Sequence, residues 1–114
     1  MSHPSTASCE TACQKCVAAC EIYLEHFRPD RRIATRQPWG ELCQACIKIC
    51  SIIIEELRLD SSCLFRISAL CAVMCRACAD ECRQQSGSEG QDCAAACLVA
   101  AHECRALAVL VGPR

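Results

Sequence analysis

The sequence predicts an all-α protein, an up-down-up-down four-helix bundle with a cysteine-lined core. Two observations lead to this fold. Fifteen of the 114 residues are cysteine, and most lie three or four positions apart, a spacing that returns side chains to one face of an α-helix. The segments that carry them are separated by short stretches of turn residues, and none alternates as a strand does. A chain of this length is expected to form one domain with one core.

Turn residues and prolines divide the chain into helices. The first helix should stop before Pro29, because a proline disfavours helical conformation in the residue before it. Pro38 suits the first turn of the second helix. Asp60–Ser62 forms a short turn, and Ser88 with Gln91 has the spacing of a capping box at the start of the fourth helix. The expected elements are a flexible tail at 1–6 and helices at about 7–28, 38–59, 61–85 and 89–111.

On each predicted helix the cysteines form one stripe, so antiparallel packing would turn four stripes of thiols toward a common lumen. Cys63 lies nearly a quarter turn off its stripe and is the least certain member of the set. An aliphatic plug of Leu57, Leu64, Leu107 and Val111 is expected at one end, and Tyr23, Phe27 and Trp39 at the other. The candidate metal ligands are Cys9, Cys13, Cys16, Cys20, Cys43, Cys46, Cys50, Cys63, Cys71, Cys75, Cys78, Cys82, Cys93, Cys97 and Cys104.

The thiols are expected to be reduced and the protein cytoplasmic. The cysteine count is odd, and the segment from Met1 to Thr6 has no export signal. Helix neighbours at i, i+4 have Cβ atoms about 5–6 Å apart, wider than the roughly 3.5–4.5 Å of a disulfide. No apolar run reaches the roughly 20 residues of a membrane span. The net charge of −1, with no large basic cluster, argues against a nucleic-acid partner.

Several roles for the thiols were weighed. Cysteine can serve simply as a small apolar core residue, but leucine or valine would fill the same volume with less risk of oxidation. Zinc favours four ligands on turns, and iron–sulfur proteins often carry a C-x2-C-x2-C-x3-C-P run. Here the CxxC pairs lie within helices, and no lysine or arginine on a stripe offsets the negative charge of such centres. An iron–sulfur or other thiolate-cluster redox protein and a zinc-binding bundle remain alternatives.

Cu(I) fits the pattern better. It is a soft ion that accepts two or three thiolates, and the six CxxxC pairs of the chain can span linear coordination. If each thiolate bridges two ions, the ratio is about one Cu(I) per cysteine and the filled core is close to neutral. No nucleophile–base pair, phosphate loop or acid pair is evident, so an enzyme is not expected.

The stretch from Ala69 to Cys82, with the run Cys9–Cys20 and the series Cys93, Cys97 and Cys104, resembles the bacterial copper storage proteins, in particular their cytosolic branch. The resemblance covers the chain from Ser8 to Leu107. It implies storage of many Cu(I) ions inside the bundle and a homo-oligomer, a tetramer. Some members carry extra cysteines where this chain has Tyr23, Ile53 and Ala100, which implies a smaller capacity here.

Other side chains receive simpler interpretations. Exposed apolar residues on the second helix, Ile52 and Leu59, suggest a contact with another subunit. A copper chaperone or a small-molecule thiol is a candidate partner for loading and release. Surface or packing roles are expected for the remaining soft donors, which are His3, His26, His102 and Met74.

Overall fold

Four long helices make up most of the molecule, as the sequence predicts. The computed structural model describes residues 4–26, 31–34, 36–85 and 87–113. The first helix begins within the segment expected to be a flexible tail, and a short helix lies in the expected arginine-rich loop. The elements are α1 (Pro4–His26), α2 (Arg31–Ala34), α3 (Pro38–Leu59), α4 (Leu64–Arg83) and α5 (Ser88–Val111).

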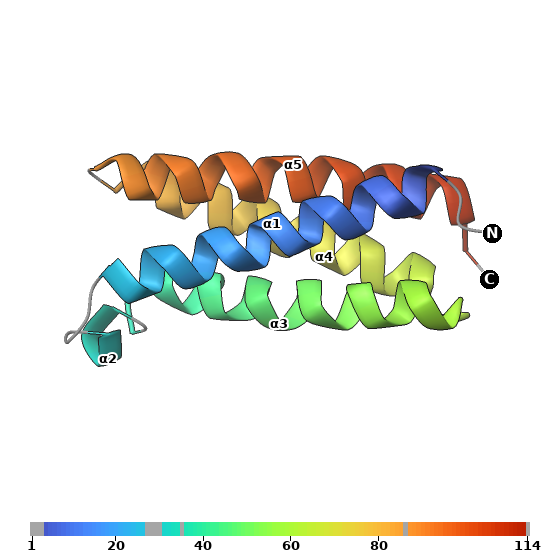
Figure 1. Ribbon diagram of the computed structural model, residues 1–114, viewed down its shortest axis with the longest axis horizontal. Coiled ribbons are helices and arrows are strands. Elements are labelled where there is room, and N and C mark those ends of the chain that lie inside the picture. The colour runs from blue at the N-terminus through green and yellow to red at the C-terminus, as the bar shows by residue number, and fades with distance from the viewer. Residues whose placement is uncertain (1–3, 27–30, 35, 86, 114) are drawn as a thin grey trace.

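The long helices run alternately up and down and form a rod of 42 × 21 × 19 Å (Figure 1). α1 packs beside α3 and α5, and α4 packs beside the same two helices. Each helix therefore turns one stripe toward a central lumen. Both chain ends lie at the same end of the rod. The prediction of an all-α four-helix bundle is confirmed.

The helix ends follow the turn residues, with one exception. Pro38 occupies the first turn of α3, as expected, and Asp60 closes this helix in the left-handed conformation, with φ 51°. The predicted capping box at the start of α5 is wrong. Ser88 already belongs to the helix, whose preceding residue makes no side-chain cap. The side chain of Gln91 instead donates hydrogen bonds to the carbonyl oxygens of Arg83 and Gln85, which ties α5 to the end of α4.

Aliphatic side chains fill the end of the lumen where α1 begins and α5 ends. Leu107 and Ile53 are fully buried and Leu64 is nearly so, whereas Leu57 and Val111 are half-buried. These side chains remove apolar surface from water whether or not metal is present. The plug can therefore hold this end of the bundle together without help from the thiols.

Aromatic side chains occupy the opposite end. The rings of Tyr23 and Trp39 are both buried, with centroids 4.7 Å apart. Gly90 makes room for Tyr23, because a Cβ at this position would lie 3.0 Å from the carbonyl oxygen of Cys82 and 3.2 Å from the Tyr23 hydroxyl. Phe27, also expected here, lies outside the described residues. This end is called the aromatic end below.

By length and composition, α5 is the one helix in the described part of the chain that could cross a membrane, with a mean hydropathy of 1.7 over an 18-residue window. Its apolar character has another explanation in this fold. The helix packs against α1 and α4, and its cysteines and Leu107 face the core. α5 therefore has the properties of a core helix in a bundle.

Candidate metal centre

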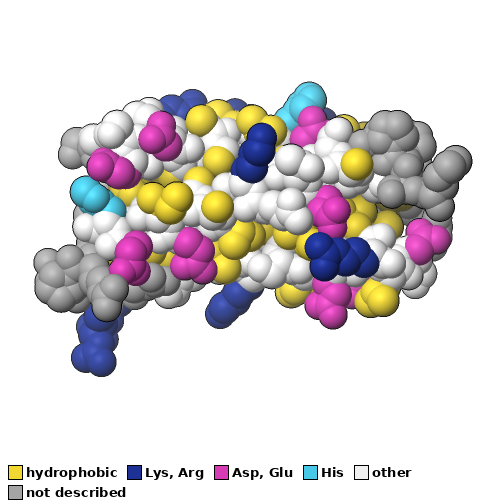
Figure 2. Space-filling view, viewed as in Figure 1, with side chains coloured by type: hydrophobic (Ala, Val, Ile, Leu, Met, Phe, Trp, Pro, Cys, Tyr) yellow, Lys and Arg dark blue, Asp and Glu magenta, His cyan; other side chains and the backbone are white. Residues whose placement is uncertain are grey.

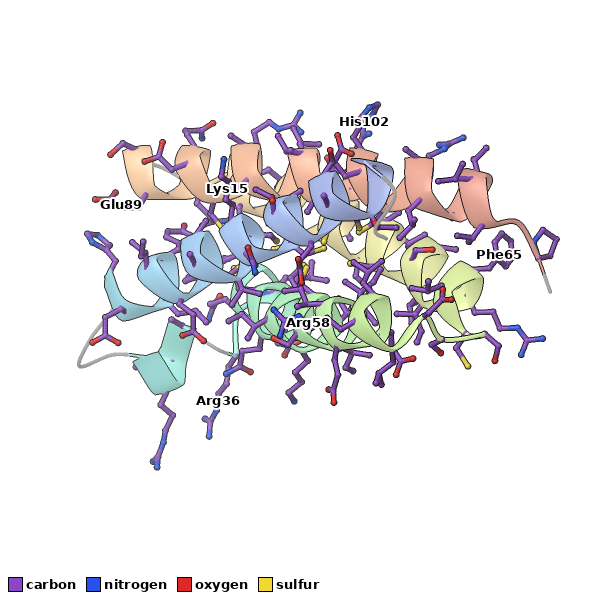
Figure 3. All side chains as sticks on the ribbon, turned by 45° about the vertical axis from the view of Figure 1, so that its right-hand side comes forward. Lys15, Arg36, Arg58, Phe65, Glu89 and His102 are labelled. Carbon is purple, nitrogen blue, oxygen red and sulfur yellow. The ribbon has the colours of Figure 1, made fainter. Side chains whose placement is uncertain are left out.

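The lumen is lined almost continuously with sulfur. Fourteen of the cysteines are buried with no exposed side-chain surface, and all fifteen are free thiols. Their sulfur atoms lie between the helices, inside the bundle (Figure 3). Cys63 is the exception: it is exposed, just before the start of α4. The structure thus separates Cys63 from the other predicted ligands, in agreement with its position off the stripe.

The closest thiols belong to different helices. The Sγ atoms of Cys16 and Cys97 are 3.5 Å apart. Those of Cys13 and Cys104 are 3.6 Å apart. Neighbours within one helix are somewhat farther apart, as for Cys71 in α4, whose Sγ lies 3.8 Å from that of the cysteine one turn later. The sequence pattern pointed to i, i+4 pairs on a single helix, but the shortest contacts cross from one helix to the next.

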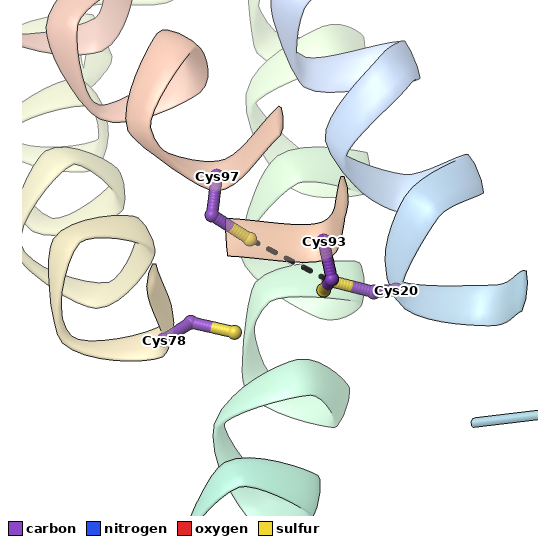
Figure 4. A group of neighbouring side chains, drawn as sticks. All are labelled: Cys20, Cys78, Cys93 and Cys97. Atoms are coloured by element: carbon purple, nitrogen blue, oxygen red, sulfur yellow. Dashed lines mark hydrogen bonds between the residues drawn. The ribbon is translucent and has the colours of Figure 1, made fainter. Parts of the chain in front are cut away.

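The cross-helix contacts assemble the thiols into overlapping groups along the lumen. Within each group the sulfurs all lie within 4.8 Å of one another, close enough to share one metal ion. Figure 4 shows one such group, to which α1, α4 and α5 all contribute. Where two groups share a member, ions bound in both groups have a sulfur ligand in common, and the Cys16–Cys97 contact links two groups that share none. The groups include Cys9/Cys13/Cys104, Cys13/Cys50/Cys71, Cys16/Cys50/Cys75, Cys20/Cys78/Cys93/Cys97 and Cys43/Cys78/Cys82/Cys93.

Hydrogen bonds between thiols shift the pKa values of the two partners in opposite directions. The bond between Cys16 and Cys20 lowers the pKa of Cys16 and raises that of Cys20. Bonds with neighbouring thiols, together with burial, also raise the pKa of Cys50. A thiol that donates its proton to a neighbour stabilises that neighbour as a thiolate, while burial penalises further ionisation. Metal ions that bind this lumen must therefore displace protons.

Few other groups could compete with the thiols for a metal ion. Ser68 and Tyr23 both carry buried hydroxyls, and that of Ser68 donates to the carbonyl oxygen of Leu64. His102 is exposed and points away from the bundle. His26 is exposed as well, and its Nδ1 atom lies 3.7 Å from Oε1 of Glu89. His3 lies outside the described residues.

Met74 supports the lumen through its backbone. Its carbonyl oxygen accepts a hydrogen bond from the Cys46 thiol at 3.5 Å, and its side chain packs against the core from a half-buried position. The sequence pattern gave no sign of this contact, because it depends on how α3 and α4 are aligned. The packing role expected for Met74 agrees with its position.

These features define a class of protein: a metal-binding helical bundle whose ligands are neutral or singly charged sulfurs in a sealed apolar lumen. The soft donors favour soft ions, and the shared groups favour several ions rather than one. The buried core of the described residues contains no lysine, arginine or carboxylate. An ion of low charge therefore suits this lumen best.

Comparison with known proteins gives the same class and narrows it. The sequence profile of the copper storage protein (Csp) family matches residues 2–109. Apo copper storage protein 3 from Bacillus subtilis is 31% identical, with a TM-score of 0.77, over 90% of this chain and 98% of that one. A Cu(I)-bound copper storage protein, BsCsp3, is 29% identical, with a TM-score of 0.81, over 91% of this chain and 98% of that one. A search among curated sequences found no significant match.

The chain belongs to the copper storage protein family. The resemblance seen in the sequence is thereby confirmed, and so is the prediction that the protein is not an enzyme.

Proposed function

We propose that this protein stores Cu(I) as a continuous thiolate cluster inside the bundle. The observation that carries the proposal is the set of buried Sγ contacts between helices, 3.5–3.9 Å long, together with groups of thiols whose sulfurs lie within 4.8 Å of one another. Each thiolate bridges two ions, which gives about one Cu(I) per lumen thiol and a nearly neutral core. The chain would then hold on the order of fourteen ions, close to the predicted ratio.

The proposed ligands are the fourteen lumen cysteines, and Cys63 is not among them. An exposed thiol at a helix start has no second sulfur at bridging distance in the described structure, so it can contribute at most a weak surface site. Copper would arrive and leave by ligand exchange with a thiol carrier, either a copper chaperone or a small-molecule thiol. Exchange between thiolates keeps Cu(I) coordinated throughout and avoids the release of free ion.

A cytoplasmic location supports this chemistry, since the thiols of the lumen must stay reduced to bind Cu(I). The similarity to copper storage protein 3 is consistent with such a compartment. The free thiols of the described chain need a reducing environment for the same reason. We therefore propose that the protein is cytoplasmic.

A homotetramer is the proposed assembly, and the outer surface offers faces for it. Apolar side chains lie among the charged ones over the surface in Figure 2. Ile52 and Leu59 on α3 are 45% and 68% exposed. A groove of about 700 Å³ between α4 and α5 is lined by Val73 and Val109, among others. Sedimentation of the wild type beside a Val73→Glu variant tests the proposed homotetramer, and a monomeric wild type would reject this assembly.

An anaerobic Cu(I) titration of the reduced protein tests the storage function. We expect saturation near 12–16 ions per chain, with sulfur-to-copper charge transfer in the ultraviolet and loss of thiol reactivity. A colourless product is also expected, whereas an iron–sulfur protein isolated without oxygen would be brown. Saturation at one to four ions would reject the storage function.

A further inference from the structure

Four thiols beneath the aromatic end form a compact tetrahedral group. The Sγ atom of Cys43 lies 3.7 Å from those of Cys78 and Cys82 and 3.9 Å from that of Cys93. The Sγ of Cys82 lies 3.9 Å from those of Cys78 and Cys93. The sixth pair also lies within 4.8 Å. Five of the six edges therefore agree to within 0.2 Å.

This size matches one kind of metal centre closely. In a tetrahedral thiolate complex with metal–sulfur bonds of 2.3 Å, the sulfurs are about 3.8 Å apart. A face of the tetrahedron also suits three-coordinate Cu(I). One ion that uses all four sulfurs at once must be tetrahedral, which is the preference of Zn²⁺. The overlapping group that includes Cys20 and Cys97 is less regular, since its two contacts of this length both come from Cys20.

We propose that the copper-free protein binds one Zn²⁺ ion in this tetrahedron, with Cys43, Cys78, Cys82 and Cys93 as the four ligands, and that Cu(I) displaces it during loading. On binding, the four thiols lose their protons to solvent. On displacement, Zn²⁺ leaves as the hydrated ion while the sulfurs pass to Cu(I), and no oxidation state changes.

The sequence pattern disfavoured zinc because the CxxC pairs lie within helices. The tetrahedron avoids that objection, because it uses none of the three CxxC pairs as a unit. Cys43 comes from α3, Cys78 and Cys82 come one turn apart from α4, and Cys93 comes from α5. A Zn²⁺ ion would thus join three helices at the aromatic end.

The remaining objection is charge, since four thiolates and one Zn²⁺ carry a net charge of −2. The phenol of Tyr23 lies next to the site. The phenol interacts with the sulfurs of Cys82, Cys43 and Cys93, and a phenol is un-ionised at neutral pH. A protonated phenol can donate a hydrogen bond to an anionic sulfur and offset part of the charge. One of the four ligands, Cys82, lies one residue from the end of α4.

Zinc titration of the reduced, copper-free protein tests the proposal, with Cys82→Ser as the ligand variant and Cys9→Ser as its matched control. Both remove one lumen thiol, but Cys9 belongs to the group at the aliphatic end. We expect one tightly bound Zn²⁺ per wild-type chain and the visible d–d bands of a tetrahedral thiolate when Co²⁺ replaces it. Cys82→Ser should weaken zinc binding by at least about 100-fold, and Cys9→Ser should leave it within about threefold.

Two further measurements keep the test decisive. If Cys82→Ser is not helical by circular dichroism, Cys43→Ser on α3 replaces it with the same expectation. Tyr23→Phe, which removes only the hydroxyl, should weaken zinc binding by about tenfold without changing the Co²⁺ bands. Absence of zinc binding, equal losses in the Cys82 and Cys9 variants, or Co²⁺ bands of another geometry would overturn the proposal.

Copper titration separates this proposal from the storage function. Cys82→Ser and Cys9→Ser should lose similar amounts of Cu(I), because both thiols belong to the same lumen. A wild type that binds many Cu(I) ions but no Zn²⁺ rejects the zinc site alone. One that binds a single Zn²⁺ but saturates at a few Cu(I) rejects the storage function and leaves the zinc site standing.

Discussion

Removal of one thiol pair from the middle of the lumen should cost several copper ions. In the variant Cys71→Ser/Cys75→Ser, two hydroxyls replace sulfurs, and a hydroxyl is a hard ligand for a soft ion. The two sulfurs are 3.8 Å apart, and each also contacts Cys50, at 3.7 and 3.6 Å. Both thiols therefore lie within the shared cluster, away from its ends.

The magnitude follows from the bridging. Each thiolate contacts two Cu(I) ions, so the two removed thiolates are ligands of at most about four ions. At one ion per cysteine, their removal should cost at least about two ions. The variant should thus bind about two to four fewer ions than the wild type. The fold should survive, because a serine in α4 can donate to the carbonyl oxygen one turn earlier, as Ser68 does to Leu64.

The assay is an anaerobic Cu(I) titration followed by ultraviolet charge transfer, with circular dichroism to verify the fold. Cys63→Ser is the control, since it removes an exposed thiol from outside the lumen. It should lose at most about one ion. Equal losses from the double variant and from Cys63→Ser would refute a continuous thiolate lumen.

Three further outcomes are expected. The reduced apo-protein should already be strongly helical by circular dichroism and change little on copper addition, because both ends of the bundle are packed by apolar side chains; a coil-like apo spectrum would contradict this. Leu107→Ala should lower the free energy of unfolding of the apo-protein by about 2–5 kcal/mol in chemical denaturation, whereas Leu110→Ala, at a position 50% exposed, should change it by less than about 0.5 kcal/mol. Copper affinity should decrease as the pH is lowered, by about tenfold per pH unit for each proton that an ion displaces. The reason is that the raised pKa of thiols such as Cys20 and Cys50 keeps them protonated until copper binds. A pH-independent affinity in competition titrations would argue against proton displacement.

Helical periodicity was sufficient to predict the bundle and the inward direction of the thiols. It also separated Cys63 from the rest, since an angle around a helix is a local property. It could not predict which thiols meet across the lumen, because that depends on the relative heights of the helices. The 3.5 Å contact between Cys16 and Cys97 and the tetrahedron at the aromatic end both depend on that alignment. The capping box failed for a related reason: Gln91 found carbonyl partners at the end of α4 instead of a cap within its own helix.

The stripe geometry has an evolutionary consequence. Each ligand occupies one inward-facing position, and the fold depends on the apolar ends and helix contacts more than on any single sulfur. Positions such as Ile53 and Ala100 are fully buried and face the same core. Substitution of Ala100 by cysteine would add a ligand with a small change in side-chain volume, whereas substitution of Ile53 would also remove apolar packing from the aliphatic end. Copper capacity in this architecture is therefore a graded trait, which selection can raise or lower one residue at a time to match the copper supply of a habitat.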